Sequence, residues 1–378
     1  MAEHIPYYQH HLGAAEIASV TQALSDPILT TGAYVEQFEK EFSNYLGCRQ
    51  AVGLMSGTAA LHLALSALGV GAGDEVITTP LSYVATATAI LNAGASPVFV
   101  DVDPETGNID PNRIDGAITP RTRAILPVHL YGQLCDMKAI QAIAGRHNLV
   151  VIEDCAHALE SRREDYGCGM LSDAACFSFY ATKNITCGEG GALVSNDHTL
   201  AKRVKMLSHH GIEALAKDLA RDGYHPRDMR ELGWKYNMSN IQAALLLPQL
   251  PMIGQRLSQR EQLWAMYNDL FASVSEISAP RELQNARHSH HLYTIWLDEQ
   301  RDRDAFVDEL FRRHIMVTVN YPPIHLFTYF RKAFGYKQGD FPHAEKIGRR
   351  TVSLPFYPSM PKKHLSIVAE TITDVIRG

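Results

Sequence analysis

Short apolar runs alternate with stretches of helical periodicity along the first two thirds of the chain. Where apolar residues recur every three or four positions, an amphipathic or buried helix is predicted. These helices are expected over 14–24, 35–46, 56–68, 84–91 and 137–147. The short apolar runs predict strands over 75–79, 97–102, 124–130, 149–153, 174–179 and 192–195.

Strands that read as unbroken apolar runs are covered on both faces. The alternation therefore predicts an α/β fold with a mostly parallel sheet between two layers of helices. In such a sheet, ligands bind beyond the carboxyl ends of the strands. Asp154 and the loop after Phe179 both follow predicted strands, so we expect a binding site there.

The pattern changes near Pro248. A long polar helix is predicted over 252–271, followed by strands over 291–297 and 317–321, a helix over 302–314 and a final helix from about Pro361. We interpret this as a large domain of residues 1–250 and a smaller α+β domain of residues 251–378.

Composition excludes several classes of protein. With 35 Lys and Arg against 41 Asp and Glu, the formal charge is −6, which argues against a nucleic-acid binder driven by bulk charge. Neither a secretory signal nor an 18-residue apolar stretch is recognised, so we expect no membrane association and a cytoplasmic location. The six scattered cysteines form no CxxC pair, which predicts free buried thiols and no metal site.

Two features of the first half could bind an anionic, flat ligand. Ser56-Gly57-Thr58 begins a predicted helix, where backbone N–H groups and hydroxyls attract anions, although the same residues make an ordinary N-cap. Tyr83 follows a predicted strand and could stack on a ring or pack in a core. Each feature alone has an ordinary structural explanation.

Two further features lie at the ends of central strands. Asp154 could hold a ring nitrogen in its protonated state or cap a helix, and His157 could reach the same ligand or serve structurally. In the run 177–191, Lys183 lies in a loop rich in Gly and Thr, where burial favours a neutral, nucleophilic amine. Ser178 offers another anion contact. The four features together fit an aromatic, electron-accepting, anionic cofactor.

Four motifs carry a resemblance to a known family: SGTAALHLAL (56–65), EDCAHALES (153–161), FSFYATKNITCGEGG (177–191) and LGWKYNMSNIQAAL (232–245). They resemble the sugar aminotransferases of the DegT/DnrJ/EryC1/StrS group, which are fold-type I pyridoxal-phosphate (PLP) enzymes. The resemblance extends from DPILTTG (26–32) into the tail. It implies PLP as the cofactor and a mostly parallel, seven-stranded sheet in the large domain.

The resemblance also implies roles for the site residues. Lys183 joins covalently to the cofactor aldehyde and shuttles a proton, and Asp154 pairs with the pyridinium nitrogen. Tyr83 stacks on the ring, and His157 lies near its phenolic oxygen. The implied phosphate contacts are Gly57, Thr58 and Ser178. The implied substrate contacts are Thr30, Thr31, His210, Tyr321 and His325.

In this family a second subunit also reaches the phosphate, which implies a homodimer with shared sites. Many members read GYNYR at the matching segment, whereas this chain reads GWKYN, so both Lys235 and Asn237 are candidates. The charged segment 216–230 is a further candidate for shaping the sugar pocket.

The implied reaction moves an amino group from an amino acid, L-glutamate, to a keto sugar. The expected acceptor is the C4 ketone of a nucleotide-linked 4-keto-6-deoxy sugar. Two alternatives from the same family stay open: a PLP-dependent sugar dehydratase, in which histidine replaces the lysine, and a PLP-binding sensor without catalysis.

Overall fold

The computed structural model describes residues 4–212 and 228–377. Its helices are α1 (Ala14–Leu24), α2 (Ala33–Leu46), α3 (Gly57–Ala67), α4 (Ala85–Asn92), α5 (Met137–His147), α6 (His198–Leu207), α8 (Asn240–Leu246), α9 (Ile253–Phe271), α10 (Arg303–Arg312), α11 (Thr328–Phe334), α12 (Pro342–Arg350) and α13 (Lys362–Arg377). Its strands are β1 (Gln50–Leu54), β2 (Glu75–Thr78), β3 (Ser96–Phe99), β4 (Thr122–Leu126), β5 (Val150–Asp154), β6 (Arg162–Arg163), β7 (Tyr166–Gly167), β8 (Ala174–Ser178), β9 (Gly191–Ser195), β10 (Ile277–Ser278), β11 (Ala286–Arg287), β12 (Tyr293–Leu297) and β13 (Thr351–Leu354).

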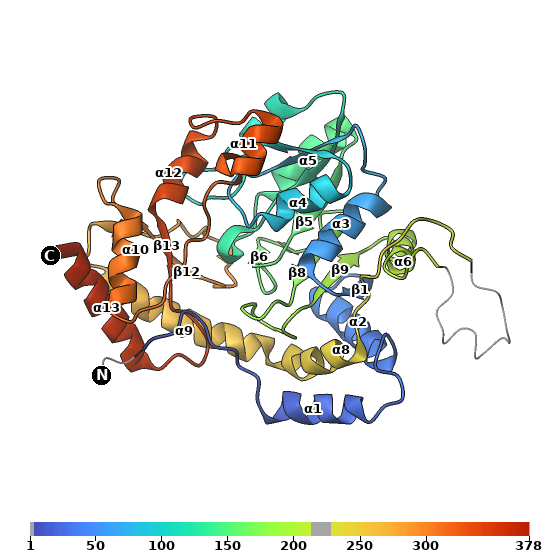
Figure 1. The fold of residues 1–378 in the computed structure, drawn as a ribbon, viewed down its shortest axis with the longest axis horizontal. Coiled ribbons are helices and arrows are strands. Elements are labelled where there is room, and N and C mark those ends of the chain that lie inside the picture. Colours follow the sequence, from blue (N-terminus) through green and yellow to red (C-terminus); the bar gives the residue numbers. More distant parts are fainter. Residues whose placement is uncertain (1–3, 213–227, 378) are drawn as a thin grey trace.

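A seven-stranded sheet in the order β1-β9-β8-β5-β4-β2-β3 forms the centre of the large domain (Figure 1). Only β9 runs against its neighbours, because it pairs antiparallel with both β8 and β1. The predicted α/β fold with a mostly parallel sheet is therefore confirmed. Strand β1 was not predicted, since its five residues contain Gly53 and carry no long apolar run.

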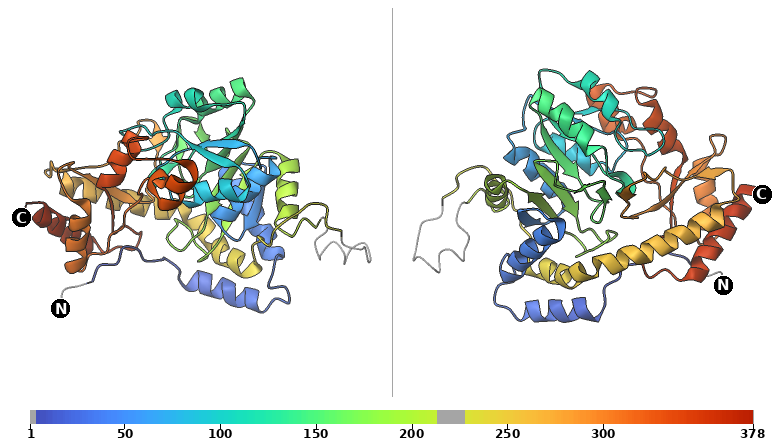
Figure 2. Two further views of the ribbon diagram at one scale, coloured as in Figure 1. Left: turned by 45° about the horizontal axis from the view of Figure 1, so that its top comes forward. Right: turned by 180° about the vertical axis from the view of Figure 1, so that it is seen from behind.

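Alternate strand residues enter two different cores, one on each face of the sheet. Ala174 and Cys176 face a core shared with α3, α4 and α6, whereas Ala175 and Phe177 face a core shared with α2, α5 and α8. Both faces are thus covered by helices, as Figures 1 and 2 show. The carboxyl ends of β5 and β8 lie side by side, because the two strands pair in parallel.

A second, smaller unit is built on the three-stranded sheet β10-β12-β13 and packs against α9, α10 and α13. Helix α9 runs between the two units: Ile253 lies in the core of the large sheet and Trp264 in the smaller core (Figure 2). Ile5 also belongs to the smaller core and bridges to Ile315, although the predicted division assigned residues 1–250 to the large domain.

The predicted strand 317–321 does not form. Thr318 makes a single bridge to Ser353, and the chain then enters Pro322 and Pro323, whose rings cannot donate to a ladder. Among the described residues, no helix is long and apolar enough to cross a membrane. The six cysteines are free and buried, as predicted.

Four aromatic rings anchor the strand that leads into the Lys183 loop. Phe42 of α2 makes edge contacts with Phe177 and Phe179, with ring centroids 5.2 and 5.4 Å apart, and stacks on Phe38 at 5.3 Å. All four side chains are buried. This cluster fixes β8 against the helical layer.

Replacing Phe42 by Ala should therefore destabilise the protein by about 3–5 kcal/mol, because the cavity left in a packed core cannot fully collapse. Scanning calorimetry of the purified variant should show a clearly lower Tm. Phe311, which is 40% exposed, provides the control, and Phe311→Ala should leave Tm nearly unchanged. Equal Tm values for the two variants would contradict the anchoring role of the cluster.

Candidate active site

A cavity of 610 Å³ lies beyond the carboxyl ends of β5 and β8. Eight of the residues predicted from the sequence line it: Gly57, Thr58, Tyr83, Asp154, His157, Ser178, Tyr321 and Lys183. The first and last of them, Gly57 and Tyr321, are more than 260 positions apart in the chain. The fold therefore brings together nearly all of the predicted cofactor contacts in one chain.

Asp154, the last residue of β5, is held rigidly in the cavity. Its Oδ2 accepts a hydrogen bond from Thr86 Oγ1 at 2.8 Å, and its Oδ1 accepts one from the Ala156 N–H at 3.1 Å. The side chain is almost fully buried. A carboxylate fixed in this way keeps its negative charge directed at a ligand rather than at water.

Lys183 projects into the same cavity from the loop after β8. Its backbone N–H donates to the Tyr180 carbonyl at 2.9 Å, which closes a turn. Burial lowers the pKa of Lys183 to about 8, although the Asp154 carboxylate acts in the opposite direction. Near neutral pH, a much larger fraction of this lysine is therefore the neutral, nucleophilic amine than for a lysine of ordinary pKa.

The start of α3 forms the anion-binding side of the cavity. Ser56 Oγ caps the helix by accepting from the Ala59 N–H at 3.1 Å, and the first N–H groups of a helix lack partners inside it. A Cβ on Gly57 would lie only 2.9 Å from Ser178 Cβ, so glycine is needed for the helix to approach β8. The hydroxyls of Thr58 and Ser178 thereby converge beside the helix dipole.

His157 and two tyrosines complete the wall. His157 Nε2 and Tyr321 Oη are 3.1 Å apart, while His157 Nδ1 is buried without a partner. Burial lowers the pKa of His157 well below its ordinary value, and the charge of Lys183 lowers it further, so the ring is neutral. Tyr83 is 63% exposed and presents its ring to the cavity mouth.

Several predicted contacts lie outside this cavity. Asn237 Nδ2 donates to Thr31 Oγ1 at 2.7 Å and approaches Thr30 Oγ1 at 3.5 Å, while Lys235 Nζ donates to Asn237 Oδ1 at 2.6 Å. These four residues, the Lys235 cluster, are absent from the lining. His210 is also absent from it and occupies a left-handed turn with φ of 63°.

His325 is not at the cavity either, so the structure gives no support to the predicted substrate contact. Its side chain is fully buried, and its Nε2 lies 3.1 Å from Glu345 Oε1. The ring packs 4.8 Å from that of Phe341. The apolar and acidic neighbours hold His325 in the protein interior. Residues 216–227 of the charged segment lie outside the described residues.

Other residues of the site carried no clear sequence signal. Thr86 orients Asp154, and His291 lines the cavity beside His157 with ring centroids 4.4 Å apart. Thr86 lies in an ordinary helical stretch, whereas the histidine-rich run 288–291 was the only available hint for His291.

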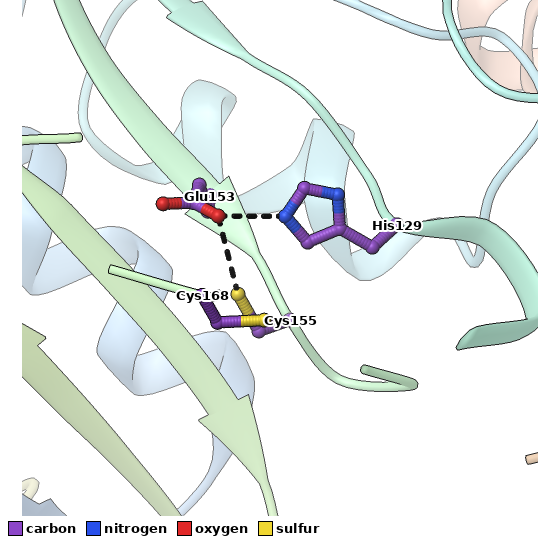
Figure 3. A group of neighbouring side chains, drawn as sticks. All are labelled: His129, Glu153, Cys155 and Cys168. Carbon is purple, nitrogen blue, oxygen red and sulfur yellow. Dashed lines mark hydrogen bonds and ion pairs between the residues drawn. The ribbon is translucent and has the colours of Figure 1, made fainter. Parts of the chain in front are cut away.

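Behind Asp154 lies a buried group of His129, Glu153, Cys155 and Cys168, shown in Figure 3. His129 Nδ1 accepts from the Cys135 N–H at 3.1 Å, so the ring proton is on Nε2, which donates to Glu153 Oε2 at 2.7 Å. A protonated Nε2 cannot ligate a metal ion. Glu153 Oε1 also accepts from the Gly169 N–H at 2.9 Å. These hydrogen bonds join His129 and Glu153 to each other and to the backbone. They therefore fix the end of β5 next to Asp154.

The cavity fits pyridoxal phosphate group by group. A helix start with converging hydroxyls suits the phosphate, Asp154 suits a protonated ring nitrogen, and the Lys183 amine suits the aldehyde. The unpartnered His157 Nδ1 suits a phenolic oxygen. Fold and site together define a PLP-dependent aminotransferase of fold type I.

Comparison with known proteins identifies the family to which this chain belongs. The model of the DegT/DnrJ/EryC1/StrS aminotransferase family matches residues 10–373, and the chain belongs to this family of PLP-dependent sugar aminotransferases.

Three relatives illustrate the likeness. The spore coat polysaccharide biosynthesis protein SpsC of Bacillus subtilis is 41% identical over 99% of this chain and 97% of its own length. Spr1654 of Streptococcus pneumoniae, described as a sugar aminotransferase and solved in a PLP form, is 29% identical with a TM-score of 0.92 over 99% of both chains. PseC of Helicobacter pylori, an aminotransferase involved in the biosynthesis of pseudoaminic acid, is 28% identical with a TM-score of 0.92, covering 99% of this chain and 100% of its own.

The lowered pKa of Lys183 predicts an unusual pH dependence of its chemical reactivity. In cofactor-free protein, modification by an amine-specific reagent should rise with an inflection at about pH 8, as followed by peptide mass spectrometry. Asp154→Asn should move the inflection lower, because the carboxylate raises the pKa. The urea-unfolded protein is the control, with an inflection at about 10.4. An inflection at that ordinary value in the folded protein would contradict the geometry.

Proposed function

We propose that this chain transfers the amino group of L-glutamate to the C4 ketone of a nucleotide-linked 4-keto-6-deoxy sugar. The observation that carries the proposal is the pairing of a lysine of lowered pKa with a buried carboxylate in one cavity. When bound, PLP supplies an aldehyde that takes up the amino group and a ring that delocalises the electrons of a broken C–H bond.

In this reaction, Lys183 and Asp154 would have different roles. Lys183 Nζ, in its neutral form, takes the proton from the α-carbon of the donor and later delivers it to the acceptor carbon. Asp154, held in position by Thr86 and the Ala156 N–H, would stabilise a positive ring nitrogen. Burial of the Asp154 side chain strengthens this charge interaction, because less water screens it. Glutamate leaves as a 2-oxo acid, and the ketone becomes an amine.

A sugar acceptor is supported by the family and by two of its relatives, one in spore coat polysaccharide biosynthesis and one in pseudoaminic acid biosynthesis. The choice of C4 rests on the GWKYN form of residues 233–237, which also occurs in family members that aminate nucleotide-linked 4-keto sugars. The presence of Lys183 favours transfer over the dehydratase alternative, in which histidine takes its place.

A panel of UDP-, GDP- and dTDP-linked 4-keto and 3-keto sugars, incubated with L-glutamate and the loaded protein, tests this proposal. Mass spectrometry should detect an aminated 4-keto-6-deoxy sugar, and Lys183→Ala should lower the rate at least a hundredfold, roughly, because the proton shuttle is lost. Lys138→Ala, at an exposed lysine paired with Glu164 and Asp165, should keep the wild-type rate. Transfer by Lys183→Ala at the wild-type rate would refute the assignment.

We also propose that two copies of the chain share each site. Lys235 and Thr30 of the Lys235 cluster are exposed, and the cluster lies outside the cavity of its own chain, which suits a contact to the phosphate bound by a second copy. Just before Thr30 and Thr31 in the sequence, the large apolar side chains of Leu24, Ile28 and Leu29 are exposed. Such residues are expected at an interface between subunits.

A mixture of two impaired variants tests whether the site is shared between subunits. Lys183→Ala and the double variant Lys235→Ala/Asn237→Ala should each be impaired. Refolded together, they should recover about a quarter of wild-type activity, because half of the dimers are mixed and contain one intact site.

The control is a mixture of Lys183→Ala with Asp154→Asn, which both alter the site of their own chain, so no intact site can form. Complementation in the control, or none in the first mixture, would show that the sites are not shared in this way.

A further inference from the structure

A buried series of hydrogen bonds leads from the smaller unit to the residue beside Lys183. Arg260 of α9 donates to Glu160 Oε1 at 2.6 Å, and Glu160 Oε2 accepts from Asn184 Nδ2 at 2.6 Å. Asn184 Oδ1 in turn lies 3.0 Å from His291 Nδ1. This series, the Glu160 relay, ends at a ring that lines the cavity.

The direction of every hydrogen bond in the Glu160 relay is fixed by its first member. The side chains of Arg260 and Glu160 are 3% and 1% exposed, so the guanidinium requires an ionised partner. A carboxylate can only accept, so Asn184 must direct its NH₂ group at Glu160 and its carbonyl at His291. His291 Nδ1 must therefore carry a proton and donate it.

The tautomer of His291 follows from this. Burial lowers the pKa of His291 well below its ordinary value, and the nearby positive charges of Lys183 and Arg260 lower it further, so the ring carries only one proton. With that proton on Nδ1, Nε2 is a lone-pair acceptor. Within the described part of the chain, no hydrogen bond engages this atom. His129 has the opposite tautomer, because a backbone N–H occupies its Nδ1.

We propose that the Glu160 relay holds His291 in the Nδ1–H tautomer, so that Nε2 accepts a hydrogen bond from the protonated amine of Lys183 within the cavity. Asn184 and Glu160 are then positioning residues for proton transfer by Lys183. His291, which lines the same cavity as Lys183, is the group that would contact it. This role rests on the proposed function, because it concerns the lysine that moves the proton.

A single isosteric change should reverse the relay. In Glu160→Gln, the new amide must keep its carbonyl on Arg260 and turn its NH₂ group toward Asn184. Asn184 must then flip and direct its own NH₂ group at His291 Nδ1, which moves the ring proton to Nε2. In Glu160→Gln/Asn184→Asp, the introduced carboxylate accepts from both neighbours, and the proton returns to Nδ1.

Neutron diffraction of crystals loaded with the amino form of the cofactor, pyridoxamine phosphate, leaves the Lys183 amine free and reads the tautomer directly. Deuterium should lie on Nδ1 of His291 in the wild type, on Nε2 in Glu160→Gln and on Nδ1 again in the double variant. Deuterium on Nε2 in the wild type, or the same position in all three proteins, would overturn the proposal. If Glu160→Gln does not fold, the position of deuterium on His291 in the wild type and in the double variant still tests the proposal.

The kinetic counterpart is the single-turnover reaction of the loaded protein with L-glutamate. Glu160→Gln should lower its rate constant about tenfold, and the double variant should restore most of the loss. Glu16→Gln is the matched control, because it removes the carboxylate of another buried Arg–Glu pair, with Arg256, away from the cavity. An equal loss in Glu16→Gln, or no recovery in the double variant, would contradict the positioning role.

The two readouts separate the proposals. If the wild type does not react with L-glutamate or aminate any keto sugar while the tautomers are as expected, the proposed function fails and the relay stands. If transfer occurs but His291 has the other tautomer, only the relay fails.

Discussion

The structure depends on holding a buried amine and a buried carboxylate together at the base of one cavity. Each charged group loses hydration there, and only a fixed partner offsets that loss. Thr86 and a backbone N–H donate to Asp154 and fix its position, whereas burial brings the pKa of Lys183 down to about 8. The same desolvation that costs stability makes the lysine nucleophilic.

The arrangement of the large sheet makes this possible. Strands β5 and β8 are neighbours and run in parallel, so Asp154 and the loop of Lys183 emerge at the same edge. The aromatic cluster around Phe42 fixes β8 from one side, and the network around Glu153 fixes the end of β5. The reactive groups are thus positioned by rigid elements, while the cavity between them stays open for a ligand.

Much of the fold and of the cofactor site could be predicted from the sequence. Periodic helices such as α1 and α5 were placed correctly, and local motifs put Lys183, Asp154 and Gly57 at strand ends and at a helix start. Four-residue β13 and five-residue β1 were missed, because their short runs give no periodic signal. The family resemblance implied a substrate contact for His325, and the structure places this side chain in the protein interior beside Glu345, outside the cavity.

Contacts between distant segments were the hardest to foresee. Glu160, Asn184, Arg260 and His291 are ordinary residues in sequence, and only the folded chain joins them into one series of hydrogen bonds. Similarly, the N-terminal Ile5 joins the core of the smaller unit through a bridge to Ile315, a residue far away in the sequence. Local patterns carry no information on such pairings.

The most direct test of the account is to find which lysine carries the cofactor. The protein is loaded with PLP, reduced with borohydride, digested and analysed by mass spectrometry. The account predicts that the added mass is found on the peptide containing Lys183 and is lost in Lys183→Ala. A reduced adduct on any other lysine, with Lys183 unmodified, would contradict it.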